Sequence, residues 1–368
     1  MSSEERKARR KKVLMLGPSG SGKSSMRAII FSNYLPKDTQ RLGPTKEVEN
    51  NNIRFLGKLT LNLWDCGGQG IFMEKYLTTD RQLIFEHVQV LIYVFNVDSP
   101  DFTKDLRDYS IVLQALQEYS PNATIFALIH KMDLVQANVR DRLLQERTLS
   151  IHAASAGLKH EIFGTTIWDQ TLYKAWAKVV FTLVPNLPVL QKHLEMFAEI
   201  TDAEEIILFE RTTFLLITSV SRTQHEGHRL NPNLDRFEKI SSIVKTFKST
   251  CIKLASNFLS LEMTAAHFSA FIDILTPNTY VLMVFPKDAG EKAVLLNNIA
   301  VGKKYFEKLE REVLAKRAVQ VEAEEYSNLE GEDQGYIEAE EGGSNIEAAW
   351  INEKADGEEM QVDAELQT

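Results

Sequence analysis

Residues 17–24 read Gly-Pro-Ser-Gly-Ser-Gly-Lys-Ser, the pattern of a loop that wraps a phosphate group. An apolar run over 13–16 precedes it and a helix-forming stretch over 25–31 follows it. Glycines let successive backbone N–H groups turn toward one anion, Lys23 adds a positive charge, and Ser24 offers a hydroxyl to Mg²⁺. A turn without a ligand would leave the lysine unexplained. We therefore predict a nucleotide-binding loop that includes Ser19, Gly20, Ser21, Gly22, Lys23, Ser24 and Ser25.

Charge is unevenly distributed over the 368 residues. Residues 321–368 contain 16 acidic residues and one lysine and so carry −15; the whole chain carries −9, which leaves +6 on residues 1–320. Because the segment over 318–368 is poor in apolar residues, we predict a disordered acidic tail there. Its composition fits a regulatory docking tail or a solubilising extension.

Two features bear on the compartment. Cys66 and Cys251 make no disulfide framework, which favours a reducing environment. The sequence has no run of about 18 apolar residues and no lipidation signal, so we expect no direct membrane insertion. The basic N-terminal arm, 1–11, either touches nucleic acid or anionic lipid or is simply solvated; we expect no nucleic acid partner.

Strand-like and helical segments alternate over residues 12–185. Near-continuous apolar runs over 90–97 and 124–129 are typical of strands buried on both faces, and 109–119 has helical spacing. The runs 53–56 and 59–64 predict a hairpin. We therefore predict an α/β domain with a parallel, helix-covered sheet, one antiparallel strand pair, and a ligand beyond the carboxyl ends of the strands.

Prolines at 185 and 188 interrupt this alternation and mark a predicted domain boundary. The region 189–317 is expected to be α+β, with a strand-like stretch over 206–220, a long helix, strands within 260–274 and 280–285, and a last helix from 295 to about 317. Apolar residues repeat along the long helix and predict one apolar stripe: Ile240, Ile243, Val244, Phe247, Cys251, Leu254 and Phe258. This region lacks clustered His, Cys or carboxylates, so we assign it binding rather than chemistry.

The segment Asp65-Cys-Gly-Gly68-Gln69 follows the second predicted hairpin strand. Asp65 is placed to hold Mg²⁺, usually through a water, and the backbone N–H of Gly68 to sense the γ-phosphate. Gln69 is placed to orient the attacking water. Asp-Xaa-Xaa-Gly alone is a weak signal, but coupled to the phosphate loop and followed by Gln it indicates a GTPase.

Two threonines lie between the first predicted helix and the hairpin. Thr45 is placed to complete the Mg²⁺ shell and to bond the γ-phosphate. Thr39 is a second hydroxyl that either reaches the nucleotide or closes a local turn.

His130-Lys131-Met132-Asp133 follows the predicted strand that ends at 129. A carboxylate at Asp133 accepts hydrogen bonds from guanine N1–H and the 2-amino group, which adenine cannot offer, and the stem of Lys131 can cover the base. His130 stands where Asn is usual. In Thr165-Thr166-Ile167-Trp168 a backbone N–H is placed to meet guanine O6, and we assign it to Ile167. We therefore expect GTP and GDP as ligands.

Several segments resemble the Rag/Gtr family of Ras-related GTPases: Lys-Val-Leu-Met-Leu-Gly with Gly-Ser-Gly-Lys-Ser, Asp65-Cys-Gly-Gly-Gln, His130-Lys-Met-Asp-Leu-Val, Thr-Ile-Trp-Asp169, Leu172-Tyr-Lys-Ala-Trp176, Leu208-Phe-Glu-Arg211, Arg236-Phe-Glu-Lys-Ile240 and Phe271-Ile-Asp-Ile274. The resemblance covers about residues 10–311. The Cys-Gly-Gly-Gln form of the segment after Asp65 resembles that of the A/B-type subunit and not the C/D-type. It implies a Ras-like domain (12–185) followed by a roadblock or longin-like dimerisation domain (189–317).

The resemblance also implies partners. These are a C/D-type subunit bound through the second domain, a lipidated membrane scaffold, a GTPase-activating complex, and the target-of-rapamycin kinase complex. It implies that the heterodimer reports amino-acid sufficiency at the cytoplasmic face of the vacuole or lysosome membrane, with further protein in the cytoplasm or nucleus.

Ser19 departs from ordinary Ras-like proteins, which have glycine beside the γ-phosphate. We expect slow intrinsic hydrolysis, on the order of 10⁻³ s⁻¹ or below, and acceleration by a partner. Arg41 is a weak candidate for an arginine acting in cis. Two other classes compete with the switch: a nucleotide-loaded scaffold without turnover, and an ATP-dependent kinase, which Asp133 disfavours.

Overall fold

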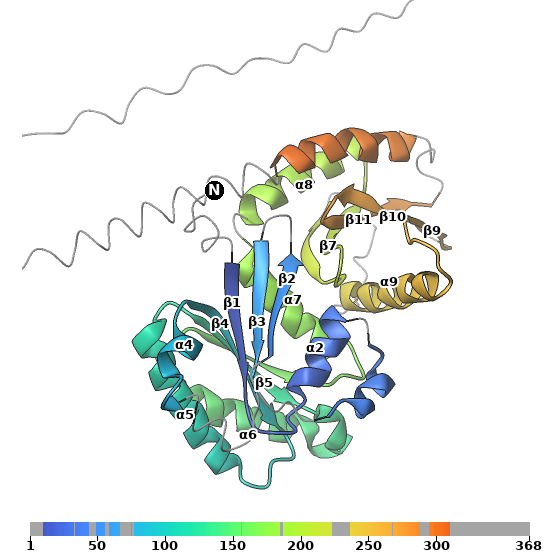
Figure 1. Cartoon of the computed structure of the whole chain (residues 1–368). Helices are drawn as coiled ribbons and strands as arrows, with labels where there is room; N and C mark the ends of the chain where they lie inside the picture. The colour runs from blue at the N-terminus through green and yellow to red at the C-terminus, as the bar shows by residue number, and fades with distance from the viewer. Residues whose placement is uncertain are drawn as a thin grey trace, which may run out of the picture. The chain divides into compact units, whose positions relative to one another are not determined.

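The first sheet has six strands in the order β2-β3-β1-β4-β5-β6 (Figure 1). Its strands are Arg10–Leu16 (β1), Glu49–Phe55 (β2), Leu59–Asp65 (β3), Val88–Asn96 (β4), Thr124–His130 (β5) and His160–Thr165 (β6). β2 and β3 pair antiparallel, and every other neighbouring pair is parallel. The prediction of a parallel sheet with one antiparallel pair is confirmed.

The structure is a computed structural model. The structure describes residues 10–32, 34–43, 49–55, 59–66, 75, 77–155, 157–184, 187–222, 236–266, 268–287 and 294–309. The described residues all belong to one unit of the chain, Met1–Glu322. The basic arm before residue 10, the hairpin turn over 56–58 and the acidic tail lie outside the described residues.

Side chains of the central strands alternate between two cores because successive residues of a strand point to opposite faces. Val13 and Met15 of β1 pack in one core, whereas Leu14 and Leu16 pack in the other. The first core is covered by α2 (Lys23–Phe31) and α7 (Thr171–Leu183). The second is covered by α4 (Arg81–Phe85), α5 (Phe102–Tyr119) and α6 (Ala137–Ala154).

The second sheet is antiparallel, with five strands in the order β8-β7-β11-β10-β9. They are Glu205–Glu210 (β7), Leu216–Ser221 (β8), Leu261–Thr264 (β9), Phe268–Thr276 (β10) and Thr279–Pro286 (β11). One face packs on α8 (Leu187–Thr201) and a helix over 294–309, in a core that continues into the first core of the parallel sheet. The other face packs on α9 (Arg236–Lys253), so this region combines an antiparallel sheet with helices on both faces (Figure 1).

Three expectations for this region differ from the structure. The stretch 206–220 is two strands, because the Glu210 carboxylate accepts hydrogen bonds from Thr212 N and Thr213 N and so closes a turn. Helix α8 was not predicted, since the proline at 188 was read as a break. Pro188 lies in the first turn of α8, where a missing N–H costs no helical hydrogen bond.

The apolar stripe predicted for the long helix extends past the helix end and is buried only in part. Val244 is buried, but Ile243 is 66% and Phe247 47% exposed. The helix ends at Lys253, so Leu254, 75% exposed, and the buried Phe258 lie beyond it. Part of the apolar stripe is therefore buried in the core, and part of it is exposed to solvent.

Candidate functional site

The phosphate-loop residues connect β1 to α2 at the carboxyl edge of the parallel sheet. A Cβ on Gly17, whose φ is 138°, would lie 2.2 Å from the carbonyl oxygen of Val94, so only glycine fits beside β4. Gly22 is the N-cap of α2, with φ 100° and no capping side chain. Ser19 and Gly20 are exposed, Ser21 is buried, and Ser24 and Ser25 lie half-buried in the first turn of α2.

Lys23 is the first residue of α2, and its side chain reaches back to the loop. Its side chain is buried, and Nζ donates to the carbonyl oxygens of Gly17 at 2.8 Å and Pro18 at 2.9 Å. Burial lowers the pKa of Lys23 to about 8, although the nearby Asp65 favours the charged form. An anion placed inside the loop would add a stronger opposite charge and hold this lysine protonated.

Asp65 ends β3 and is fully buried. It pairs with Met15 in the β1–β3 register, which brings its carboxylate to the loop, and Arg27 Nε lies 3.1 Å from its Oδ2. The neighbouring Cys66 thiol is buried, and burial raises its pKa to about 12, so it stays neutral. Carboxylate and hydroxyl oxygens suit Mg²⁺, so Asp65 and Ser24 fit the predicted metal site. The other predicted residues here, Thr45, Gly68 and Gln69, lie outside the described residues.

His130 connects the end of β5 to the phosphate loop. Its Nδ1 lies 2.9 Å from Thr165 Oγ1 at the end of β6, and a Cβ on Gly22 would lie 2.7 Å from its Cδ2. The imidazole thus occupies the space that Gly22 leaves. Burial, with a smaller effect of Lys131, lowers the pKa of His130 to about 4, so the ring is neutral at pH 7.

Replacing His130 with Asn tests this buried neutral ring. The unfolded chain takes up a proton near pH 6.5 and the folded chain only near pH 4, so the ring's contribution to stability is lost as pH falls between these values. From pH 7 to pH 5 the wild type should lose about 2 kcal/mol more unfolding free energy than His130→Asn. Urea unfolding at each pH measures this.

The matched control is His87→Asn. His87 is an exposed residue with φ 59°, a conformation that Asn tolerates. Any pH dependence that His130→Asn shares with this variant does not come from the buried ring. A constant stability gap between His130→Asn and the wild type would contradict the buried neutral state.

The predicted base-binding residues lie at the ends of β5 and β6. Asp133 is exposed in a short 3₁₀ helix, Met132–Leu134 (η2), and its Oδ1 accepts a hydrogen bond from Thr166 Oγ1 at 2.5 Å. Lys131 precedes it with φ 66° and is half-buried. Ile167 directly follows Thr166 and is half-buried. Sequence reasoning missed Thr165 and Thr166, although their position at the end of β6 and directly after it was the available signal.

Thr39 lies in the 3₁₀ helix Pro36–Arg41 (η1). Its side chain is buried, and its hydroxyl donates to the Pro36 carbonyl oxygen at 2.7 Å. This hydrogen bond is the local turn contact that the sequence offered as the alternative to nucleotide binding. Binding of the nucleotide by Thr39 stays a prediction.

The loop, the buried lysine, the strand-end carboxylates and the parallel sheet define a P-loop GTP-binding protein with a Ras-like domain. A family model described as the Gtr1/RagA G protein conserved region matches residues 12–244. The chain belongs to this family, as an A/B-type Rag/Gtr GTPase that binds guanine nucleotides.

Individual relatives agree with this assignment. The chain is 51% identical over 300 residues to the GTP-binding protein gtr1 of Schizosaccharomyces pombe, covering 81% of this chain and 96% of that protein. It is 46% identical to the Ras-related GTP-binding protein B of Rattus norvegicus, covering 83% and 87%. Similarity to the Ras-related GTP-binding protein C of Homo sapiens is lower, 28% over 219 residues, covering 57% and 53%. In the described part of the chain, no helix combines the length and apolarity needed to span a bilayer.

Proposed function

We propose that GTP binds with its phosphates on residues 19–25 and that its terminal phosphate controls the affinity for partners. The observation that carries the proposal is the buried Lys23, held inside a loop of left-handed glycines at the carboxyl edge of the sheet. Ser24, Thr45 and Asp65 would hold Mg²⁺, which would neutralise charge on the phosphates.

The base would bind at the ends of β5 and β6. The Asp133 carboxylate accepts from guanine N1–H and the 2-amino group, with Thr166 holding one carboxylate oxygen in place. The stem of Lys131 covers the base and the N–H of Ile167 donates to O6. The neutral His130 links the base-binding end of the sheet to Gly22 of the phosphate loop.

In hydrolysis a water attacks the γ-phosphorus and the bond to the β–γ bridging oxygen breaks, giving GDP and phosphate. Gln69 would orient this water, while Thr45 and the N–H of Gly68 contact the γ-phosphate and release after cleavage. The exposed side chain of Ser19 would narrow the approach of an arginine from a partner. We therefore expect slow turnover without an activating complex.

The second sheet would bind a C/D-type subunit to form a heterodimer. Support comes from α9, where Ile243 and Phe247 are exposed, and from β9, which ends the described sheet and pairs with β10 on one side. Exposed apolar side chains and an open strand edge are features of surfaces that bind another protein. Relatives of this chain include the C and D Ras-related GTP-binding proteins.

The proposed cellular role follows from the family. The GTP-bound heterodimer would signal amino-acid sufficiency to the target-of-rapamycin kinase complex. A lipidated scaffold would recruit it to the vacuole or lysosome membrane, since the described residues include no spanning helix. We propose two domains, 12–185 and 189–317, the second of roadblock type.

Co-purification with a C/D-type subunit tests the proposal. The complex should run as a one-to-one heterodimer, bind GTP in a magnesium-dependent manner, and resist competition by a 100-fold excess of ATP. Ile243→Asp on α9 should weaken binding of the C/D-type subunit at least about tenfold. Ile243 is exposed in this chain, and the aspartate would place a charge in the proposed interface, where the partner would bury it.

Ile200→Asp is the matched control, because Ile200 is 76% exposed but lies on α8. Its pairing should match the wild type. Equal binding of GTP and ATP by the wild type would contradict the nucleotide assignment. Unchanged pairing of Ile243→Asp would contradict the proposed surface.

A further inference from the structure

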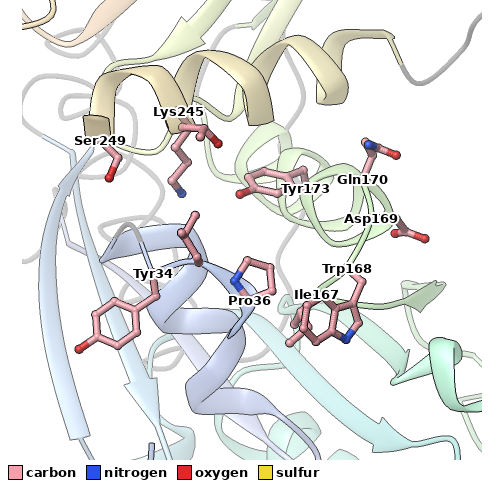
Figure 2. A pocket seen from close by; sticks show the side chains of 11 residues that line it. Tyr34, Pro36, Ile167, Trp168, Asp169, Gln170, Tyr173, Lys245 and Ser249 are labelled. Atoms are coloured by element: carbon pink, nitrogen blue, oxygen red, sulfur yellow. The ribbon is translucent and has the colours of Figure 1, made fainter. Parts of the chain in front are cut away.

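Helix α9 contacts the phosphate-loop helix through one buried lysine. Lys245 of α9 is 6% exposed, and its Nζ donates to the carbonyl oxygens of Ile29 at 2.6 Å and Ile30 at 2.7 Å. Both carbonyls belong to the last turn of α2, the helix that begins at Lys23. Figure 2 shows the Lys245 side chain directed from α9 toward this part of the chain.

The contact satisfies a requirement of helix ends. The last four carbonyls of a helix have no partner within the helix, and a cation there also meets the negative end of the helix dipole. Lys245 supplies the hydrogen-bond donors and the positive charge. The ring centre of Tyr173 in α7 lies 5.5 Å from Lys245 Nζ. Burial lowers the pKa of Lys245 to about 7; Lys248 acts in the same direction and Glu210 opposes it.

A cavity of about 110 Å³ adjoins this contact. It is walled by the turn after α2 (34–36), the segment 167–170 that contains the predicted base contact, and α9 through Thr246 and Ser249 (Figure 2). Apolar packing is therefore incomplete here. The two hydrogen bonds of Lys245 connect α9 directly to the end of α2.

We propose that Lys245 is a positioning residue, through which α9 holds the carboxyl end of the phosphate-loop helix and slows nucleotide release. The α2 helix of nine residues is about 14 Å long, so a tilt of the helix would displace both of its ends. Fixing its far end limits the tilt that would open the loop around the phosphates. The inference rests on the proposed placement of the nucleotide on this loop.

Lys245→Met tests the inference, because methionine keeps most of the volume and loses both hydrogen bonds. The full-length protein is loaded with a fluorescent GDP analogue, and its dissociation is followed after excess GDP is added. Release should be about tenfold faster, whereas single-turnover hydrolysis of bound GTP should change less than about twofold, since Lys245 is proposed to touch no phosphate. Lys245→Arg, which keeps the charge and the donors, should restore most of the slow release.

The matched control is Lys248→Met. Lys248 lies on the same helix and donates to the Arg211 carbonyl oxygen at 2.7 Å, within the second sheet's region. This variant loses the same kind of bond without touching α2, so its release rate should stay within about twofold of wild type. If both variants release the GDP analogue equally fast, the substitutions loosen the protein generally and the inference is overturned. A release rate in Lys245→Met equal to that of the wild type would also overturn it.

A measurement on the wild type covers the case in which Lys245→Met fails to fold. Loading with GDP should slow amide hydrogen exchange in α9 around Lys245, because coupling between two sites is reciprocal. Unchanged exchange there would overturn the inference. If the wild type does not bind the GDP analogue, both the proposed nucleotide site and the inference are overturned. If the analogue binds normally and Lys245→Met releases it at the wild-type rate, only the inference is overturned.

Discussion

Asp133→Asn should weaken GTP binding by roughly 10³-fold and improve binding of xanthosine triphosphate. The Asp133 carboxylate is a pure acceptor, matched to the N1–H and 2-amino donors of guanine. Asparagine presents one acceptor and one donor, which match the N1–H and the 2-oxygen of xanthine. Isothermal titration with each nucleotide measures the exchange of preference.

Inosine triphosphate sharpens this experiment, because it lacks the 2-amino group. The wild type should bind it more weakly than GTP, and Asp133→Asn should bind the two almost equally. Asp169→Asn is the control: it removes one charge nearby, but the Asp169 carboxylate accepts from Thr171 N at the start of α7. Its nucleotide preference should not change. Retained GTP preference in Asp133→Asn would disprove the proposed base contact.

Gln69→Leu should slow GTP hydrolysis at least about 100-fold and leave GTP affinity within about twofold of wild type. The amide of Gln69 is proposed to orient the attacking water in the transition state, whereas leucine offers neither donor nor acceptor. Phosphate release with and without the activating complex measures the rate, and nucleotide titration measures the affinity.

Gln69→Asn is the control for side-chain polarity, and its shorter amide should also fail to orient the water.

The wild-type result distinguishes the two functions that the sequence leaves open, a GTPase switch and a nucleotide-loaded scaffold. If the wild type shows no turnover even with its activating complex, and nucleotide state does not alter partner affinity, the chain is a nucleotide-loaded scaffold. Normal hydrolysis by Gln69→Leu would remove Gln69 from the reaction.

The parallel sheet followed from sequence because its signals are local. The buried strands β4 and β5 are continuous apolar runs, and α5 has helical spacing. The long helix shows the limit of such signals. Apolar spacing identified α9, but whether Ile243 or Val244 is buried depends on which neighbours pack against the helix. Similarly, Pro188 breaks or begins a helix depending on its position in the turn.

The sequence by itself determined the glycine-rich loop between β1 and α2 and the polar residues near the ends of β3 and β5, since a loop's backbone shape and charge depend on neighbouring residues. Tertiary structure alone decided that His130 fills the space at Gly22, that Thr166 bonds Asp133, and that Lys245 caps α2. These contacts join residues 33 to 216 positions apart. Burial then fixes their consequences, because an imidazole or ammonium group removed from water changes its pKa and needs a partner that only folding brings near.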